Sequence, residues 1–166
     1  MTTEDAFADV KAANETFAAG YNDSGLEAKA AKGLGVLTCM DSRIDPLRLL
    51  GLQAGDAKIL RNAGARVTED VLRTLVLARY LLAVERVLVM AHTRCRMAGG
   101  SEADVHTAIA AAGGPDTRSM SFLTTDDQRA ALATDVERIR SSPYLPDLVV
   151  GGFIYDLDTG RLEQVV

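Results

Sequence analysis

The chain alternates between two patterns of apolar and polar positions. Short apolar runs bounded by glycine or charged residues are typical of buried strands; they are Leu34–Thr38, Ala57–Leu60, Arg86–Ala91 and Leu148–Tyr155. Between and around them, apolar residues three or four positions apart predict helices over about residues 3–19, 69–83, 102–111 and 125–140. Because strands alternate with helices, we expect an α/β fold. Its central sheet is mostly parallel and flanked by helices, and a C-terminal strand–turn–strand surrounds residues 158–160.

Local signals add detail to this outline. Asp45 before Pro46 predicts the start of a short helix, and Thr68 is placed to cap the helix that follows it. Thr125 together with Gln128 has the spacing of a capping box, which predicts a helix start at Thr125. A short helix is also expected around Leu26–Ala31. The helix over 69–83 has apolar residues around most of its circumference, which predicts burial on two sides.

Length and composition indicate one globular domain over residues 1–166. Hydrophobic residues make up 48% of the chain and charged residues 25%, as in soluble globular proteins. The net charge of −5 without any basic block argues against nucleic acid or an anionic membrane as the partner. Charged residues interrupt every long apolar run, and the first ten residues lack the apolar core of a signal peptide. We therefore expect a cytoplasmic protein with reduced thiols.

The residues best suited to chemistry lie after two of the predicted strands. Cys39 ends the first strand, and His92 and Cys95 follow the strand Arg86–Ala91. Carboxyl ends of parallel strands meet at one edge of a sheet, so these three side chains are expected to gather there. Two thiolates and one imidazole form a zinc-compatible set that leaves a fourth position open. Taken alone, Cys39 fits ordinary core packing better than a ligand role, and His-x-x-Cys alone is only suggestive of a metal site; the combination of all three favours zinc. A disulfide between the two cysteines is disfavoured in a reducing compartment.

A second candidate group follows Cys39 directly. Asp41 lies two residues beyond the first thiol, and Arg43 is placed to form a bidentate pair with its carboxylate. An Asp held in this way stays ionised and does not occupy the open metal position. The simpler interpretation of the pair is an ordinary salt bridge within a loop.

These residues resemble the β-class carbonic anhydrases, in particular the smaller actinobacterial-type members. The resemblance rests on CMDSR at 39–43, RNAG at 61–64 and HTRC at 92–95, and it covers about residues 34–97. It implies that zinc-bound hydroxide hydrates CO₂ reversibly to bicarbonate and a proton, with one Zn²⁺ per chain. Cys39, His92 and Cys95 would be the metal ligands, and Asp41 and Arg43 the catalytic dyad.

The same resemblance implies further features. Residues 62–64 would line the pocket. The family works as homodimers or higher homo-oligomers with an N-terminal helix embracing the partner, for which residues 3–19 are the candidate, although this helix would equally fit its own subunit. Two thiolates neutralise the charge of Zn²⁺, so the zinc lowers the pKa of its bound water less than it would with three neutral histidines. We therefore expect activity to be shifted toward alkaline pH. His106 is a proton-shuttle candidate by composition alone, and a surface histidine is the favoured interpretation.

Two residues depart from the family pattern. Arg94 and Arg96 flank Cys95 where a small polar residue and a glycine are more usual; they are expected to point into solvent, the alternative being a raised anion affinity. These two departures keep open the alternative that the protein is a hydrolase of carbonyl sulfide or carbon disulfide that uses the same zinc site. A non-catalytic zinc-binding interaction domain is a third possibility, which Asp41 and Arg43 argue against. A nucleotide-binding domain is weaker still, because the sequence has no P-loop.

Overall fold

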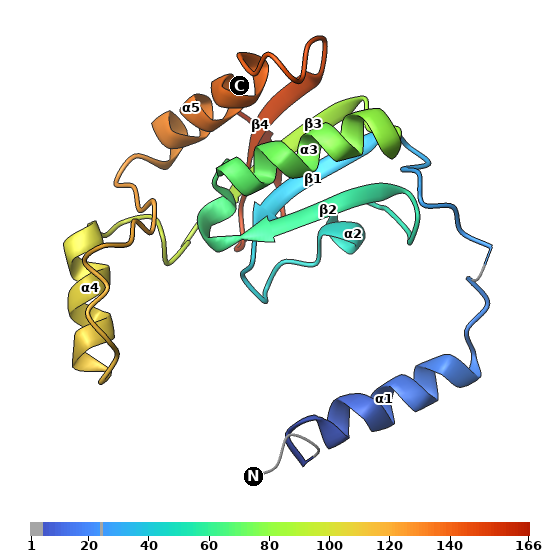
Figure 1. The fold of residues 1–166 in the computed structure, drawn as a ribbon, viewed down its shortest axis with the longest axis horizontal. Helices are drawn as coiled ribbons and strands as arrows, with labels where there is room; N and C mark the ends of the chain where they lie inside the picture. Colours follow the sequence, from blue (N-terminus) through green and yellow to red (C-terminus); the bar gives the residue numbers. More distant parts are fainter. Residues whose placement is uncertain (1–4, 24) are drawn as a thin grey trace.

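The computed structural model describes residues 5–23 and 25–166. One sheet of five strands in the order β2-β1-β3-β4-β5 forms its centre (Figure 1). The strands are β1 (Leu34–Cys39), β2 (Ala57–Asn62), β3 (Arg86–His92), β4 (Val149–Tyr155) and β5 (Leu162–Gln164). Strands β1 to β4 pair in parallel, and β5 returns antiparallel to β4. The predicted α/β class and the C-terminal strand–turn–strand are confirmed.

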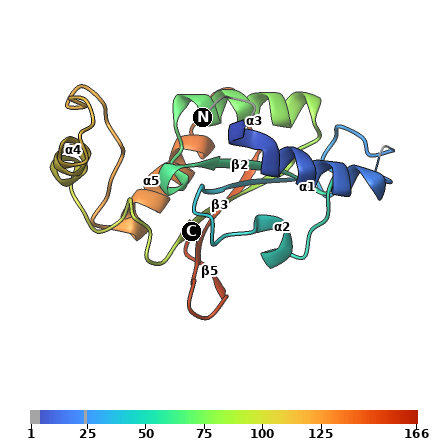
Figure 2. The ribbon, with the colours of Figure 1, turned by 90° about the horizontal axis from the view of Figure 1, so that it is seen from below.

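Helices cover the two faces of this sheet unequally. They are α1 (Ala8–Ala19), α2 (Pro46–Leu49), α3 (Glu69–Leu81), α4 (Glu102–Ala111) and α5 (Gln128–Arg140), with 3₁₀ turns η1 (Asp5–Phe7) and η2 (Ala63–Ala65). Helices α3 and α5 lie on one face of the sheet and the short α2 lies on the other (Figure 2). Turn η2 follows β2 at the carboxyl edge, where β1 and β3 also end.

Each face has its own apolar cluster. Leu37, Val89 and Val136 belong to the larger one, between the sheet and helices α3 and α5, and all three are fully buried. Burying one such side chain contributes about 1.5–3 kcal/mol. On the face of α2 a smaller cluster contains Cys39 and Cys95 together with Ile44 and Met90. Both cysteines are therefore packed inside the protein rather than held on a surface loop.

Two of the predicted helix starts are confirmed and one is wrong. The Asp45 carboxylate accepts a hydrogen bond from Arg48 N at 3.2 Å, and the Thr68 hydroxyl accepts one from Val71 N at 3.4 Å. Helix α5 is instead capped by Asp127, which accepts from Ala130 N at 3.0 Å. Thr125 does not cap it because its backbone is paired with the segment that follows Cys95.

The expected helix over Leu26–Ala31 is also wrong. Residues 25–33 form turns and irregular backbone, and tertiary partners take the hydrogen bonds that a helix would use. Ala30 N donates to Leu82 O at 2.8 Å, and Ala31 N donates to Gly55 O at 3.0 Å. This segment is thus bound across the ends of other elements, which overrides its weak helical pattern.

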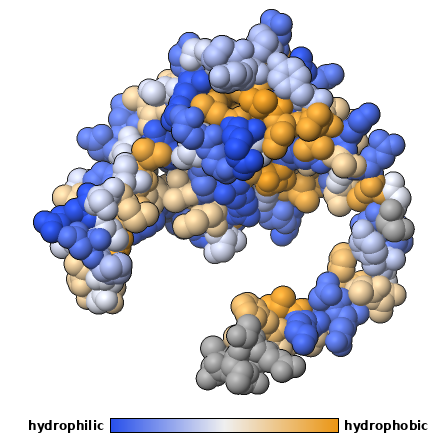
Figure 3. Space-filling view, in the orientation of Figure 1, coloured by the Kyte–Doolittle hydropathy of each residue, from blue (hydrophilic) through white to orange (hydrophobic). Residues whose placement is uncertain are grey.

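Burial of α3 on two sides is wrong as well. Its buried residues are Val71, Leu75 and Ala78, which share one face. On the other face Leu77 is 44% exposed and Leu81 is 65% exposed. An apolar patch is visible over this helix in Figure 3. The all-round apolar pattern therefore corresponds to one buried face and one exposed apolar surface.

Helix α1 stands away from the sheet, and the segment that follows it leads to β1 (Figure 1). The prediction over residues 3–19 agrees with η1 and α1, and residues 3 and 4 lie outside the described residues. None of its residues is buried, and Phe17 is 62% exposed. Within the described ranges, no helix combines the length and apolar character that crossing a membrane requires.

Candidate metal centre

Cys39, His92 and Cys95 meet at the carboxyl edge of the sheet. Their ligand atoms all lie within 4.8 Å of one another. Cys39 is the last residue of β1, His92 is the last residue of β3, and Cys95 follows in the next turn. The two strands are neighbours in parallel register, so they deliver their last side chains to the same place. All three side chains are buried, with exposures of 5%, 1% and 6%.

The His92 ring is oriented as a metal ligand would be. Its Nδ1 lies 2.9 Å from the Thr93 carbonyl oxygen, an interaction that assigns the ring proton to Nδ1. Its Nε2 is buried without a hydrogen-bond partner in the described part of the chain. A buried polar atom without a partner is costly, and a metal ion would satisfy it. Two thiols beside a free imidazole nitrogen form a donor set that fits zinc.

The two thiols have opposite pKa shifts. A hydrogen bond from the Cys95 thiol, with smaller contributions from the neighbouring His92 ring and from the backbone amides of Gly64 and Asp41, moves the Cys39 pKa well below its ordinary value despite burial. That same bond, together with burial, moves the Cys95 pKa well above its ordinary value. Burial lowers the pKa of His92, but contact with the Cys39 thiolate and the Thr93 carbonyl outweighs it, and the net shift is upward. Cys39 is thus the group that is most ready to bind a cation.

Turn η2 brings a backbone donor to this thiolate. Gly64 N donates to Cys39 Sγ at 3.4 Å. Gly64 has φ +79, a left-handed conformation, and a Cβ there would lie 3.1 Å from the Cβ of Met97. Both facts favour glycine at this position. Of the residues expected to line the pocket, Gly64 touches a candidate ligand, whereas the Asn62 side chain bonds the backbone of Arg66.

Asp41 and Arg43 form the expected pair. Arg43 Nε donates to Asp41 Oδ1 at 2.9 Å, and its Nη2 donates to Asp41 Oδ2 at 2.6 Å. These bonds hold the pKa of the Asp41 carboxyl well below its usual range. Asp41 Oδ2 also lies 3.9 Å from His92 Nε2. The carboxylate is therefore ionised, beside the donor cluster, and already committed to Arg43.

Further residues that hold this site were not singled out from the sequence. Arg61 donates to the carbonyl oxygens of Cys39, at 3.0 Å, and Asp41, at 2.7 Å. Gln128 Nε2 donates to His92 O at 3.0 Å. The only sequence signal for Arg61 is its place at the start of RNAG, and Gln128 drew notice only as a helix-capping residue. Both act on backbone atoms of residues distant in sequence, which residue spacing does not reveal.

Arg94, Arg96 and His106 lie outside the donor cluster. Arg94 and Arg96 are exposed, as expected, and Arg94 forms an ion pair with Asp158 at 2.8 Å. Of these two arginines, Arg94 has a left-handed backbone, with φ +55, and Arg96 does not. His106 lies on α4, which stands apart from the sheet (Figure 1), and its Nδ1 is 2.9 Å from Thr117 Oγ1.

This chain is similar to known proteins in both sequence and fold. The carbonic anhydrase family matches residues 34–132. The chain is 32% identical to Beta-carbonic anhydrase 1 of Mycobacterium tuberculosis over 99% of each chain. It is 28% identical to a carbon disulfide hydrolase of Acidianus sp., covering 79% of this chain and 76% of that protein. A crystal structure of carbonic anhydrase from Streptococcus mutans superposes with a TM-score of 0.91 at 33% identity, covering 100% of this chain and 99% of that chain.

Proposed function

Because this chain belongs to the β-carbonic anhydrase family, we propose that it catalyses the reversible hydration of CO₂ to bicarbonate and a proton. The observation that carries the proposal is the Asp41 carboxylate, ionised and held by Arg43, beside a buried cluster of two thiols and an imidazole. A site that only stabilises the fold has no need of this carboxylate. CO₂ is neutral, so the net charge of −5 neither helps nor hinders its approach.

Cys39, His92 and Cys95 would hold one Zn²⁺ per chain. The proposal is supported by the Nε2 atom that lacks a partner and by the spacing of the three ligand atoms. When bound, zinc lowers the pKa of a coordinated water and supplies a hydroxide nucleophile near neutral pH. The hydrogen bond from Gly64 N partly offsets the charge of the Cys39 thiolate, which makes the pair of thiolates a less strongly donating set.

Asp41 and Arg43 would act on the nucleophile. The two bonds from Arg43 keep the carboxylate from becoming a further metal ligand, so that water has access to the centre. Asp41 Oδ2 would accept a hydrogen bond from the attacking oxygen and so direct its lone pair at the carbon of CO₂. Arg43 is oriented in turn by the Arg94 carbonyl, to which its Nη2 donates at 3.2 Å.

Hydrolysis of carbon disulfide or carbonyl sulfide is the second candidate. Relatives named carbon disulfide hydrolase share 28% identity with this chain over most of its length. Both sulfur compounds present the same linear electrophilic carbon as CO₂, so one nucleophile would serve all three. Only hydrolysis of the sulfur compounds releases hydrogen sulfide, and this product separates the two activities.

Zinc content and stopped-flow CO₂ hydration, measured on the wild type and on Asp41→Asn, test the proposal. We expect one zinc per chain in both proteins, and turnover lower in the variant by about 100-fold, the usual range for a positioned proton acceptor. If the wild type binds one zinc per chain but does not turn over CO₂, the carbonic anhydrase assignment is rejected. Sulfide release from carbon disulfide and carbonyl sulfide would then decide for the alternative.

The partner would be a second copy of the same chain, in a homodimer or a larger assembly. Turn η1 exposes Phe7, helix α1 exposes Val10 and Phe17, and α3 exposes Leu77 and Leu81. Such apolar surfaces are typical of contacts between subunits. Residues 1–166 would act as one domain, and the two reduced thiols favour the cytoplasm as the compartment.

A further inference from the structure

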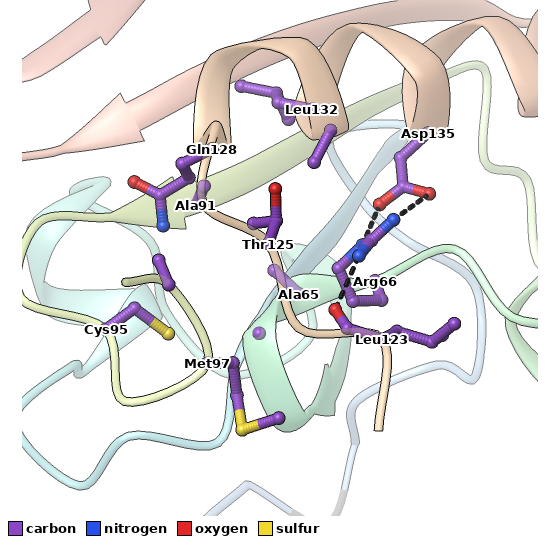
Figure 4. A pocket seen from close by; sticks show the side chains of 13 residues that line it. Ala65, Arg66, Ala91, Cys95, Met97, Leu123, Thr125, Gln128, Leu132 and Asp135 are labelled. Carbon is purple, nitrogen blue, oxygen red and sulfur yellow. Dashed lines mark hydrogen bonds and ion pairs between the residues drawn. The ribbon is translucent and has the colours of Figure 1, made fainter. Parts of the chain in front are cut away.

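A buried ion pair lies next to the candidate metal centre without belonging to it. Arg66 Nε donates to Asp135 Oδ2 at 2.6 Å, and the two side chains are only 17% and 6% exposed. Arg66 follows η2, whereas Asp135 lies on α5. Between this pair and Cys95 is a cavity of about 20 Å³ (Figure 4), room for about one water molecule. Little solvent therefore separates the pair from Cys95.

Arg66 also binds a third segment. Its Nη1 donates to Leu123 O at 2.6 Å, a bond drawn in Figure 4. Leu123 has φ +57, a left-handed conformation that costs a residue with a Cβ about 1–2 kcal/mol. Two residues further on, Thr125 pairs with the chain after Cys95, because Thr125 N donates to Met97 O at 3.1 Å and Gly99 N donates to Thr125 O at 2.9 Å. The guanidinium thus joins α5, η2 and the segment that supports the Cys95 loop.

The backbone of Arg66 is fixed just as firmly. The Asn62 side chain accepts from Arg66 N at 2.9 Å and donates to Arg66 O at 2.7 Å. These bonds close the turn that contains Gly64, whose N–H points at Cys39 Sγ. A displacement of Arg66 would therefore move the Gly64 N–H, which donates to Cys39 Sγ on one side of the centre. It would also free the Leu123 carbonyl, and so loosen the nearby Thr125, which bonds Met97 on the other side.

We propose that Arg66 and Asp135 are positioning residues of the metal centre. They place the Gly64 N–H on Cys39 and the loop of Cys95 in one geometry by joining η2, α5 and Leu123. The proposal rests on the proposed function only in that the bound ion is taken to be zinc. It goes beyond that function because neither residue touches the ligand atoms.

A purely stabilising role for the pair makes a different prediction. A buried ion pair can be replaced by apolar side chains of similar volume without loss of stability. The double variant Arg66→Met/Asp135→Leu should then keep its unfolding temperature and its zinc affinity. If the pair positions the centre, the variant keeps its fold but loses the bond to Leu123 and the fixed place of Gly64. Zinc affinity then falls about tenfold or more, the usual effect of removing an outer support of a ligand.

The chain offers a matched control. Arg138 also lies on α5 and also bonds the segment before α3, because its Nη1 donates to Val67 O at 2.7 Å. Its side chain is 40% exposed and pairs with Glu69, and none of its hydrogen bonds reaches η2 or Leu123. Arg138→Met therefore removes a hydrogen bond between α5 and the segment before α3, and we expect no effect on the metal centre.

The test compares zinc-loaded wild type, Arg66→Met/Asp135→Leu and Arg138→Met. Zinc affinity is measured by competition with a chelator, and amide hydrogen exchange is followed in residues 60–66. We expect weaker zinc binding and faster exchange in the double variant alone. Zinc affinity within twofold of the wild type in a folded double variant would overturn the proposal.

A second variant covers the case in which the double variant does not fold. Arg66→Lys keeps the charge beside Asp135, but an ammonium group cannot reproduce the planar fork that also reaches Leu123. We expect it to weaken zinc binding and to speed exchange at Gly64, and unchanged values in both measurements would overturn the proposal. Because neither measurement uses CO₂, a wild type that binds zinc but lacks hydration activity would reject the proposed function alone.

Discussion

The Asp41 carboxylate accepts three hydrogen bonds from Arg43: from its backbone N at 3.0 Å, from Nε at 2.9 Å and from Nη2 at 2.6 Å. Asp116 and Arg118, which have the same spacing, form the same bonds with the same partners at 3.0, 2.9 and 2.6 Å. Asp116 lies in the segment after α4, outside the metal centre. The geometry of the pair is therefore a local property of Asp-x-Arg, and its catalytic use depends on where the fold places it.

Replacement of Arg43 by lysine tests the two-bond grip on Asp41. A single ammonium group does not hold both carboxylate oxygens in one plane. We expect zinc content to stay at the wild-type value and the turnover number for CO₂ to fall about 10- to 100-fold, the range seen when a reacting group is displaced. Arg118→Lys makes the same change in the distant pair and should leave turnover within twofold. Equal turnover in the two variants would remove Arg43 from the mechanism.

Arg94→Gly should stabilise the protein. Arg94 has φ +55, which costs about 1–2 kcal/mol for a residue with a Cβ, and glycine avoids this cost. The lost pair with Asp158 is exposed and contributes about 0–1 kcal/mol. We expect a rise of about 2 °C in the unfolding temperature of the zinc-loaded protein. Arg94→Ala loses the same pair but keeps the strained backbone, so a rise there of equal size would refute the explanation.

Zinc binding should depend on pH through two ligands and not three. His92 and Cys95 have raised pKa values and must each release a proton, whereas Cys39 has a lowered pKa and is already a thiolate. Below the raised pKa of His92, log Kd should rise by about two for each unit by which the pH falls. Chelator competition at pH values below the ordinary imidazole pKa of about 6.5 gives this slope. A slope near three would show that Cys39 is also protonated.

Glu102 should stabilise the segment after α4 in a pH-dependent way. Its carboxylate accepts from Phe122 N at 2.8 Å and from Thr124 N at 3.0 Å, and these bonds lower its pKa. A lowered pKa in the folded state means that the stabilisation is present above the ordinary pKa of about 4.3 and is lost as pH falls through the folded value. Glu102→Gln should therefore speed amide exchange at residues 121–124 near neutral pH, and by less in acid.

Glu137, an exposed carboxylate on α5, supplies the control for that experiment. Glu137→Gln removes one negative charge without removing an acceptor from residues 121–124. Its exchange in that segment should match the wild type at every pH. If both variants change exchange alike, general charge and not the Glu102 bonds would be the cause.

Helix α1 should matter for assembly and not for the fold of the subunit. Phe17 is 62% exposed and lies 5.6 Å from Tyr21, ring centre to ring centre, with no buried residue on its helix. Phe17→Ser should weaken self-association, measured by sedimentation velocity over a range of concentrations, while the unfolding of the isolated subunit stays unchanged. Tyr144 lies outside α1 and is 70% exposed, so Tyr144→Ser serves as the control and should sediment as the wild type does.

The residues of the candidate centre could be named from the sequence because each rests on a local rule. The apolar run before Cys39 and the run before His92 are strands, and parallel neighbouring strands end at the same edge. Asp-x-Arg forms its pair within three residues. The starts of α2 and α3 followed from Asp45 and Thr68 for the same reason, because a capping residue bonds an amide only three positions away.

Tertiary structure decided the hydrogen bonds between segments distant in sequence, beyond the meeting of the strand ends that the parallel sheet already implied. The turns over Leu26–Ala31 replace a helix because Ala30 bonds Leu82, and Thr125 yields the cap of α5 to Asp127 because it pairs with Met97. The Gly64 donor, and the support that Arg66 and Asp135 give it across 69 positions, likewise exist only in the folded chain. Periodicity and capping report on a residue and its near neighbours. Packing alone sets which distant backbone groups meet, and those meetings fix the geometry of the metal centre.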